Sequence, residues 1–341
     1  MIIRGKAPLR IGLAGGGSDV SPYSDLYGGA ILNATLNMYA YATIRPRDDH
    51  RIIIHAPDRE LSLTLPSHER LEINGELDLI KGIYNRIVKD FTHQPLSFEI
   101  TAHVDAPPGS GLGSSSTLVT TVLGVFAEWL GLPLGDYDLA HLAYRIERID
   151  LDLPGGKQDQ YAATFGGVNF MEFYKDDKVI VNPLRMKTET LSELAYNLIL
   201  YNTGVSRTSV RIIEQQKHSV ETNRQSSIEA MHKIKEQAIL MKEALLKGQT
   251  DQVGEILNFG WHYKKLMADG ISNDTLEEIY HTAMKAGATG GKISGAGGGG
   301  FMLFYCPDNT RFKVIEALKK FGGDIHRYEF TENGLKTWTI K

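Results

Sequence analysis

The feature that most constrains the fold is a glycine- and serine-rich junction between a strand-like and a helix-like segment. Residues 107–117 read PPGSGLGSSST, with three glycines and four serines. The preceding stretch, 96–106, alternates apolar and polar residues as a strand does, and the following stretch, 118–131, is apolar enough for a buried helix. The chain is therefore predicted to turn from a strand into a helix with little side-chain bulk at the turn.

Such a turn has the properties of a phosphate cradle. Glycine enters left-handed backbone conformations and leaves room for a ligand to approach. The first peptide N–H groups of a helix are unpaired and carry the positive end of the helix dipole. A glycine-rich turn that leads into a helix therefore favours phosphate binding, and its serine hydroxyls can cap the helix or coordinate a Mg²⁺ ion that bridges phosphates.

Three other interpretations of the turn are less favoured. A P-loop requires G-x-x-x-x-G-K-[ST], and no lysine follows Gly113. A dinucleotide-binding fingerprint requires G-x-G-x-x-G, but the third glycine position is Ser114 when counted from Gly109 and Ser116 when counted from Gly111, which argues against an NAD-dependent oxidoreductase. A flexible surface turn is disfavoured because Pro107 and Pro108 stiffen its entry.

Composition bounds the class of protein. A chain of 341 residues can bury a large core and suggests two domains. The net charge of −4 gives no basic field for nucleic acid, so a polyanionic ligand needs a locally positive site. Cys306 is the single cysteine, so no internal disulfide can form. The first ten residues carry charges where a signal peptide needs an apolar core. No run of about 18 apolar residues occurs, so no transmembrane helix is expected. We therefore expect a cytoplasmic protein without nucleic-acid or membrane partners; the sequence does not indicate the oligomeric state.

The pattern of apolar residues predicts a β-rich first half and a second half of strands with long helices. The expected strands of the first half are 1–14, 31–46, a hairpin of 51–56 and 61–65, and a pair at 167–173 and 178–184. The expected helices there are 78–91, 114–130 and 136–149. After a boundary near 185–195 we expect a strand at 196–203, helices at 227–248 and 274–286, a strand–loop–strand unit over 288–307, and a closing helix with two short strands. Gly248 is a candidate C-cap, and Ser272 or Asn273 a candidate N-cap.

Three motifs in order resemble those of the GHMP kinases. They are KAPLRIGLAGGGSD (6–19), PPGSGLGSSST (107–117) and GKISGAGGGGFMLFY (291–305), and ERIDLDLPGGKQDQYAATFGG (147–167) resembles the sugar-kinase branch of that family. The resemblance implies an α+β fold with a ribosomal-protein-S5-like domain over 1–190 and a ferredoxin-like domain over 191–341. It also implies transfer of a phosphoryl group from ATP, with Mg²⁺, to the anomeric O1 of a sugar. A heptose 7-phosphate is the favoured acceptor; a fucose-like sugar, or a catalytically silent binding protein, is the alternative.

The resemblance also implies roles for particular residues. Asp159 corresponds to the aspartate that accepts or orients the hydroxyl proton, and Arg10 to the catalytic Lys/Arg position. Ser115 and Glu147 correspond to the Mg²⁺ ligands. The spacing from Glu147 to Asp159 is one residue longer than in mevalonate kinase, so Asp150 stays open as the alternative ligand.

Two further sets of residues follow from the same motifs. The expected nucleotide-binding residues are Pro108, Gly109, Ser110, Gly111, Leu112, Gly113, Ser114, Ser115 and Ser116. The expected substrate-binding residues are Gly16, Gly17, Ser18, Asp19, Gly295, Gly297 and Gly298. A phosphorylated acceptor needs a second anion site, for which Lys81, Arg86, Lys157 and Arg45 are candidates among which the sequence does not choose. The third motif is expected to pack against the phosphate cradle.

Overall fold

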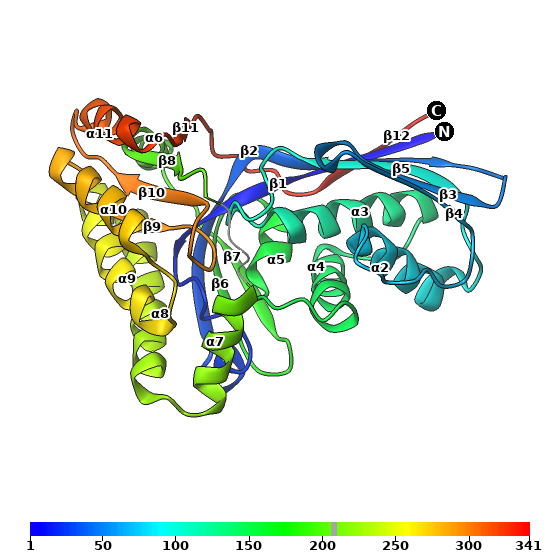
Figure 1. Cartoon of the computed structure of the whole chain (residues 1–341), viewed down its shortest axis with the longest axis horizontal. Helices are drawn as coiled ribbons and strands as arrows, with labels where there is room; N and C mark the ends of the chain where they lie inside the picture. Colours follow the sequence, from blue (N-terminus) through cyan, green and yellow to red (C-terminus); the bar gives the residue numbers. More distant parts are fainter. Residues whose placement is uncertain (206–209) are drawn as a thin grey trace.

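One long antiparallel ribbon organises the first sheet (Figure 1). The computed structural model describes residues 1–205 and 210–341. The strand order is β12-β1-β2-β5-β3-β4, and β6 pairs with β2 and with β7. The strands are β1 (Ile2–Ala14), β2 (Gly29–Pro46), β3 (Arg51–Ala56), β4 (Leu61–Pro66), β5 (Phe98–Val104), β6 (Val168–Phe173), β7 (Val179–Pro183) and β12 (Lys336–Ile340). Because β2 has 18 residues, its first part pairs with β6 and its last part with β5.

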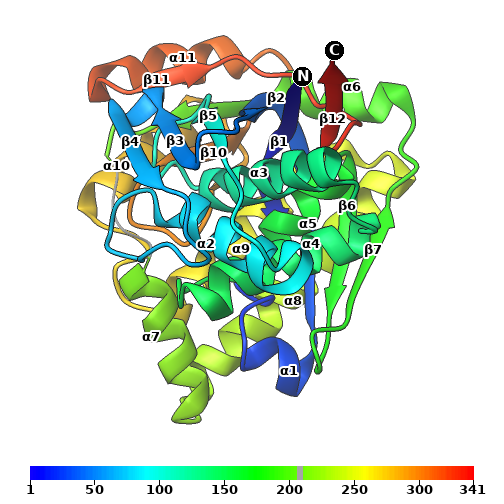
Figure 2. The same ribbon diagram turned by 90° about the vertical axis from the view of Figure 1, so that its right-hand side faces the viewer.

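Helices cover one face of this sheet. They are α2 (Asp78–Ile87), α3 (Ser114–Leu130), α4 (Asp136–Arg145) and α5 (Gln158–Phe165). The short helix α1 (Tyr23–Tyr27) is not part of this layer, since its Tyr23 packs in a core with residues of the second half of the chain. Figure 2 shows α3 lying across the sheet, with α4 and α5 beside it. The strongly apolar residues 118–126 of α3 are buried in a core with β2, β5 and α2, so the start of α3 is held rigidly against the sheet.

A second, antiparallel sheet has the order β11-β8-β10-β9. Its strands are β8 (Leu198–Asn202), β9 (Gly290–Ile293), β10 (Phe301–Tyr305) and β11 (Asp324–His326), and its helices are α6 (Thr188–Asn197), α7 (Val210–Glu221), α8 (Gln225–Lys247), α9 (Val253–Met267), α10 (Asp274–Ala286) and α11 (Arg311–Leu318). A common core joins the two sheets, since Leu9 and Ile11 of β1 pack in one cluster with Leu303 of β10 and Met241 of α8. This shared core fixes the glycine-rich loops of both halves relative to one another.

Most of the predicted elements are confirmed. The strands, the hairpin of β3 and β4, and the pair of β6 and β7 are all present. Gly248 ends α8 in the left-handed conformation, and the Asn273 side chain accepts a hydrogen bond from the Leu276 N–H, which identifies Asn273 as the cap of α10. The predicted helix 136–149 ends as α4 at Arg145 and continues as one wide turn over 146–150.

The prediction missed helices α1, α5, α6, α7 and α9. The strand predicted from residue 196 begins at Leu198, because residues 188–197 form α6. Helix α9 was not predicted, since Gly254 and Gly260 lower its helix propensity. Both glycines are required by packing: a Cβ on Gly254 would lie 1.9 Å from the Thr289 side chain, and one on Gly260 would lie 2.0 Å from that of Gln237. Close packing on α8 and β9 therefore outweighs local propensity here.

The division into domains at residue 190 stays a prediction. The first sheet is built almost entirely from residues before that point and the second from residues after it. The exception is β12, the last strand of the chain, which returns to pair with β1.

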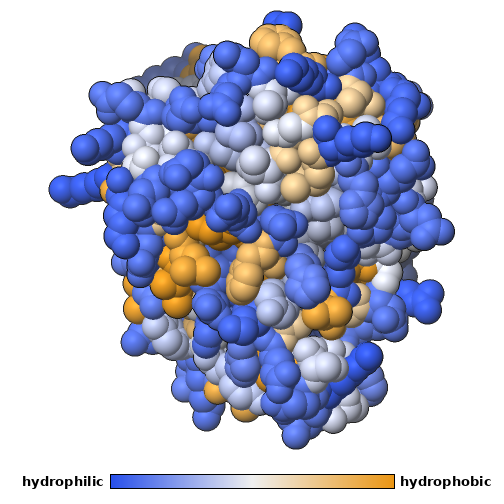
Figure 3. Space-filling model, turned by 90° about the vertical axis from the view of Figure 1, so that its left-hand side faces the viewer, coloured by the Kyte–Doolittle hydropathy of each residue, from blue (hydrophilic) through white to orange (hydrophobic). Residues whose placement is uncertain are grey.

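The surface offers little apolar area on the side of the second sheet. Figure 3 shows that face covered mainly by hydrophilic residues, with hydrophobic ones in separate small patches. None of the helices within 1–205 and 210–341 is long and apolar enough to cross a membrane.

Candidate active site

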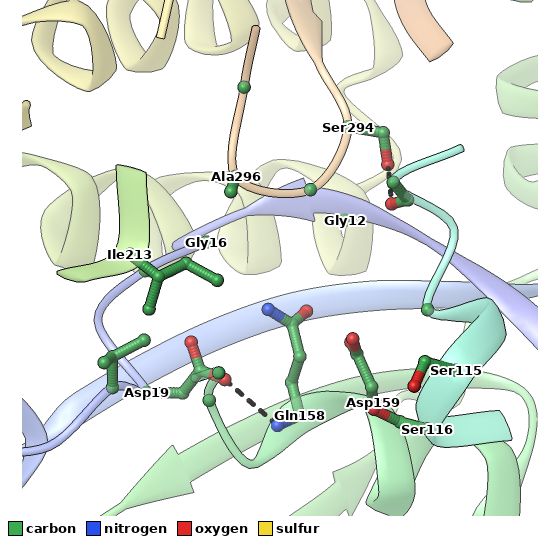
Figure 4. A pocket seen from close by; sticks show the side chains of 18 of the residues that line it. Gly12, Gly16, Asp19, Ser115, Ser116, Gln158, Asp159, Ile213, Ser294 and Ala296 are labelled. Carbon is green, nitrogen blue, oxygen red and sulfur yellow. Dashed lines mark hydrogen bonds between the residues drawn. The ribbon is translucent and has the colours of Figure 1, made fainter. Parts of the chain in front are cut away.

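A cavity of about 200 Å³ lies where glycine-rich segments from both halves of the chain meet. Its wall is formed by residues of the β1 end and the following turn, the 109–116 turn, the 154–159 segment and the 294–299 loop. Figure 4 shows Ser115, Ser116 and Asp159 at one side of this cavity and Asp19 and Ile213 at the other, with Gln158 between them. The cavity is therefore elongated, with chemically different ends.

The 109–116 turn has the conformation that its glycines predict. Gly109, Gly111 and Gly113 have φ angles of 75°, 77° and 78°, a region that favours glycine. Gly113 is the N-cap of α3 and no side chain caps it, so the first amides of the helix are left for a ligand. Ser114, Ser115 and Ser116 line the cavity together with the three glycines.

Three predicted nucleotide-binding residues of the same turn do not line the cavity. Leu112 is buried in the core. Ser110 is also buried, and its carbonyl accepts the Phe301 N–H at 3.0 Å. Pro108 is exposed at the entry of the turn. These three residues belong to the turn but do not form the surface that faces the cavity.

The third glycine-rich motif packs directly on this turn, as predicted. The Ser294 hydroxyl donates to the Gly111 carbonyl at 2.8 Å. A Cβ on Gly111 would lie 2.4 Å from the Ser294 carbonyl oxygen, and a Cβ on Gly295 would lie 2.7 Å from the Gly111 Cα. Gly295 and Gly297 line the cavity, whereas Gly298 lies behind it and donates its N–H to the Ile271 carbonyl.

Arg10 and Asp159 form an ion pair next to the turn. The Arg10 Nε donates to Asp159 Oδ1 at 2.7 Å, and Nη2 lies 2.6 Å from the same oxygen. Nη1 donates to the Gly111 carbonyl at 2.6 Å. The Asp159 carboxylate also contacts the turn, since a Cβ on Gly113 would lie 3.3 Å from its second oxygen, Oδ2. The guanidinium thus fixes a partly exposed carboxylate at the start of α3.

The structure places Glu147, and not Asp150, beside Ser115. The Ser115 hydroxyl donates to Glu147 Oε1 at 2.6 Å, and the Gln160 amide donates to Oε2 at 2.7 Å. Arg148 lies 3.3 Å from Oε1. Asp150 instead faces a second cavity, of about 580 Å³, where its carboxylate lies 3.5 Å from Arg86. Of the two acids considered as the second Mg²⁺ ligand, Glu147 is therefore the one that lies next to Ser115.

The far end of the cavity is formed by the turn after β1. Gly16, Gly17 and Asp19 line it, whereas the buried Ser18 hydroxyl donates to the Gly15 and Ala30 carbonyls and so holds the turn in shape. Asp19 Oδ2 accepts the Gln158 N–H at 3.0 Å. Burial raises the pKa of Asp19, and this hydrogen bond partly opposes the rise.

Several cavity residues were not singled out from the sequence. They are Arg148, Gln158, Ile213, Gln216, Lys264 and Lys292. Lys292 lies within the third motif, so its place in the sequence was a signal that could have been used. Lys264 lies in α9, which the sequence did not predict, and it is brought to the cavity only by the tertiary fold.

The fold is that of the GHMP kinases. The family model described as GHMP kinases N terminal domain matches residues 78–167, and the one described as GHMP kinases C terminal matches residues 241–324. The chain belongs to the GHMP kinase family and is an ATP-dependent kinase with the two-domain fold of that family.

Three individual relatives of this chain are kinases named for sugars or sugar phosphates. The chain is 50% identical over 338 residues to D-glycero-alpha-D-manno-heptose 7-phosphate kinase of Campylobacter jejuni, with 99% of each chain covered. A solved D-glycero-D-manno-heptose 1-phosphate kinase from Bacteroides thetaiotaomicron superposes with a TM-score of 0.85 at 48% identity, again with 99% of each chain covered. Lactococcus lactis galactokinase, at 20% identity and a TM-score of 0.76 over 98% of this chain and 95% of its own, shares the fold.

Proposed function

We propose that the chain transfers the γ-phosphoryl group of ATP to the anomeric O1 of D-glycero-α-D-manno-heptose 7-phosphate. The product is the 1,7-bisphosphate, a precursor for GDP-heptose and surface glycans. The identity of the acceptor is supported by the similarity to the Campylobacter jejuni heptose 7-phosphate kinase, which is 50% identical over 99% of this chain. The observation that carries the chemistry is the Arg10–Asp159 pair, held against the phosphate-binding turn. We infer that the reaction takes place in the cytoplasm, where ATP is available.

Asp159 is the residue proposed to accept the proton of the O1 hydroxyl. A positioned carboxylate contributes about 10²–10⁴ to the rate of such a transfer. Arg10 holds Asp159 through Oδ1, which leaves Oδ2 on the side of Gly113 for the acceptor hydroxyl. The guanidinium also places positive charge beside the transferring phosphoryl group, where charge stabilisation is the main catalytic contribution.

The turn and the start of α3 are proposed to bind the nucleotide phosphates. Their backbone N–H groups supply the positive potential that a chain of net charge −4 must provide locally. The packing of the 294–300 loop on Gly111 keeps this turn in one conformation. A fixed turn orients the γ-phosphate toward Asp159 and so lowers the entropy lost on reaching the transition state.

The residues beside the turn fit a magnesium ion. The Ser115 hydroxyl and the Glu147 carboxylate are oxygen donors 2.6 Å apart, and hard oxygen ligands are those that Mg²⁺ prefers. Gln160 and Arg148 orient Glu147 from behind. When bound, the ion would neutralise charge on the nucleotide phosphates.

At the far end, Asp19 is proposed to accept hydrogen bonds from sugar hydroxyls. One of its oxygens is bonded to the Gln158 N–H, which fixes the carboxyl group in the cavity wall. Gly156 is required for this approach, since a Cβ there would lie 1.9 Å from Asp19 Oδ2. The exposed glycine backbone of Gly16 and Gly17 leaves space for the sugar ring.

An acceptor panel tests the proposal. ADP release would be measured with Mg-ATP and D-glycero-D-manno-heptose 7-phosphate, L-fucose, D-mannose or galactose, and the position of the new phosphate would be read by NMR. We expect turnover of the heptose phosphate at O1. Turnover of L-fucose alone would rule out heptose 7-phosphate as the acceptor but would not contradict the proposed site residues. If no acceptor is turned over, the proposed activity is rejected.

A further inference from the structure

Two lysines of the cavity wall are buried without a carboxylate partner. Lys264 of α9 and Lys292 of β9 are each 3% exposed. The Lys264 Nζ donates to the Gly295 carbonyl, and the Lys292 Nζ donates to the Gly12 carbonyl, both at 2.6 Å. Within residues 1–205 and 210–341, neither forms an ion pair. A buried ammonium group that forms no ion pair is costly, so an anionic ligand in the cavity would stabilise these lysines.

The two lysines lie at different places along the cavity. A Cβ on Gly12 would be 3.8 Å from the Lys292 Nζ, which places that group on the strand that carries Arg10. A Cβ on Gly16 would be 3.7 Å from the Lys264 Nζ, which places that group at the turn before Asp19. Figure 4 shows Gly16 at the end of the cavity away from Ser115 and Ser116. Lys264 therefore faces the end proposed to hold the acceptor.

The two lysines differ in the charges that surround them. Burial lowers the pKa of Lys264 to about 8, with a contribution from Arg10 that nearby Asp19 opposes. Burial, together with the positive charges of Lys264 and Arg10, holds the pKa of Lys292 well below its ordinary value. Burial thus favours the neutral amine at both lysines, and at Lys264 the Asp19 carboxyl opposes that effect.

The four basic residues considered from the sequence do not line this cavity. The Lys81 Nζ donates to the Asn74 side chain, and Arg86 lies in the second cavity. The Lys157 Nζ lies 2.8 Å from Asp177. Arg45 is an exposed residue of β2. A phosphate group carried by the acceptor would contact none of them while O1 lies at Asp159.

We propose that Lys264 binds the phosphate group that the acceptor already carries, and so makes the site specific for a phosphorylated sugar. This inference rests on the proposed function, because it requires a sugar phosphate acceptor. The phosphate on C7 is carried by the two-carbon side chain of the sugar ring, so it can contact a part of the cavity wall that O1 at Asp159 does not occupy, and Lys264 lies at the Gly16 turn in that wall. One of the three ammonium donors is used by Gly295, so two remain for phosphate oxygens.

The test compares Lys264→Met with Lys265→Met. Lys265 follows on the same helix but pairs with Glu277 outside the cavity, at 2.9 Å. For Lys264→Met we expect the KM for heptose 7-phosphate to rise about 10²-fold, with KM for ATP unchanged and kcat within about threefold, as for loss of a charged hydrogen bond. Calorimetry should show weaker binding of heptose 7-phosphate but equal binding of the unphosphorylated heptose. Lys265→Met should behave as the parent.

Other outcomes overturn the inference. An equal loss on both sugars, or a rise in KM for ATP, would show that Lys264 acts on the transferring group or on the fold instead. If Lys264→Met melts early, Lys264→Arg and Lys264→Gln replace it: the arginine variant should retain the preference for the phosphorylated sugar and the glutamine variant should lose it, and equal preference would refute the role. Failure of the proposed function would be recognised separately, since the parent enzyme would then not turn over heptose 7-phosphate.

Discussion

Replacing Gly111 by alanine tests whether the two glycine-rich loops must touch. The new methyl group would lie 2.4 Å from the Ser294 carbonyl oxygen, about 1 Å closer than a carbon and an oxygen approach without strain. The Gly111 φ angle of 77° is also unfavourable for alanine. Because the close atoms belong to the backbone, no side-chain rotation can relieve the contact. The loop of the third motif must therefore move away from the phosphate-binding turn.

Gly131, at the other end of α3, provides the matched control. Its φ angle of 60° is equally left-handed, but a Cβ there would have no neighbour within 4 Å. Gly131→Ala should therefore lower the free energy of unfolding by about 1 kcal/mol, because alanine is less stable than glycine in this backbone conformation. Gly111→Ala should lower the free energy of unfolding by the same amount and by about 1–3 kcal/mol more, because of the close contact with the Ser294 carbonyl. For a chain of this size, where 1 kcal/mol lowers Tm by roughly 1.4 °C, the expected decreases are about 1–2 °C and about 3–6 °C.

Thermal melts and steady-state kinetics would be measured together. Displacing the turn by about 1 Å should lower kcat/KM for Mg-ATP by about 10²-fold in Gly111→Ala and leave Gly131→Ala unchanged. Equal melting temperatures for the two variants, with full activity in both, would refute the argument that contact between the loops holds the turn in its active form.

Four further predictions follow from the site and the fold. Asp159→Asn should lower kcat about 10²–10⁴-fold, and a variant within threefold of the parent would exclude Asp159 as the proton acceptor. Glu147→Gln should raise the Mg²⁺ concentration for half-maximal activity by at least about 10-fold; an unchanged magnesium titration would place the ion elsewhere. Asn273→Ala should destabilise the protein by about 1 kcal/mol through the lost cap of α10, with no change in KM, and an unaltered unfolding midpoint would contradict the cap. Because the pKa of Lys264 is lowered to about 8, its charge is present below that pH and lost above it, so KM for the sugar phosphate should rise between about pH 7 and 9 in the parent and stay flat in Lys264→Met.

Local sequence predicted the parts of the site that depend on local geometry. The 109–116 turn follows from glycine spacing between a strand and an apolar helix, and both neighbours determine its conformation. The Arg10–Asp159 pair joins positions 149 residues apart, so its prediction depended on the family resemblance rather than on spacing. The choice of Glu147 over Asp150 required the wide turn over 146–150, which no propensity indicates.

Lys264 shows where prediction from the sequence stops. A lysine in an amphipathic helix is usually solvated, and nothing in WHYKKLM distinguishes Lys264 from Lys265. Helix α9 packs on β9 and α8 through glycines that weaken the helical pattern, so the helix itself was missed. That packing buries Lys264 and leaves Lys265 partly exposed, where it pairs with Glu277.

The return of β12 to the first sheet affects the order in which the molecule can be completed. Ile2 pairs with Ile340, so the two ends of the chain lie side by side (Figure 1). Until residues 336–340 have been synthesised, one edge of β1, the strand that carries Arg10, has no partner in this sheet over residues 2–6. The pairing of β1 in this sheet is thus completed only after β12 has been synthesised, and a chain interrupted before β12 exposes an unpaired edge on the strand that supplies the site with its arginine.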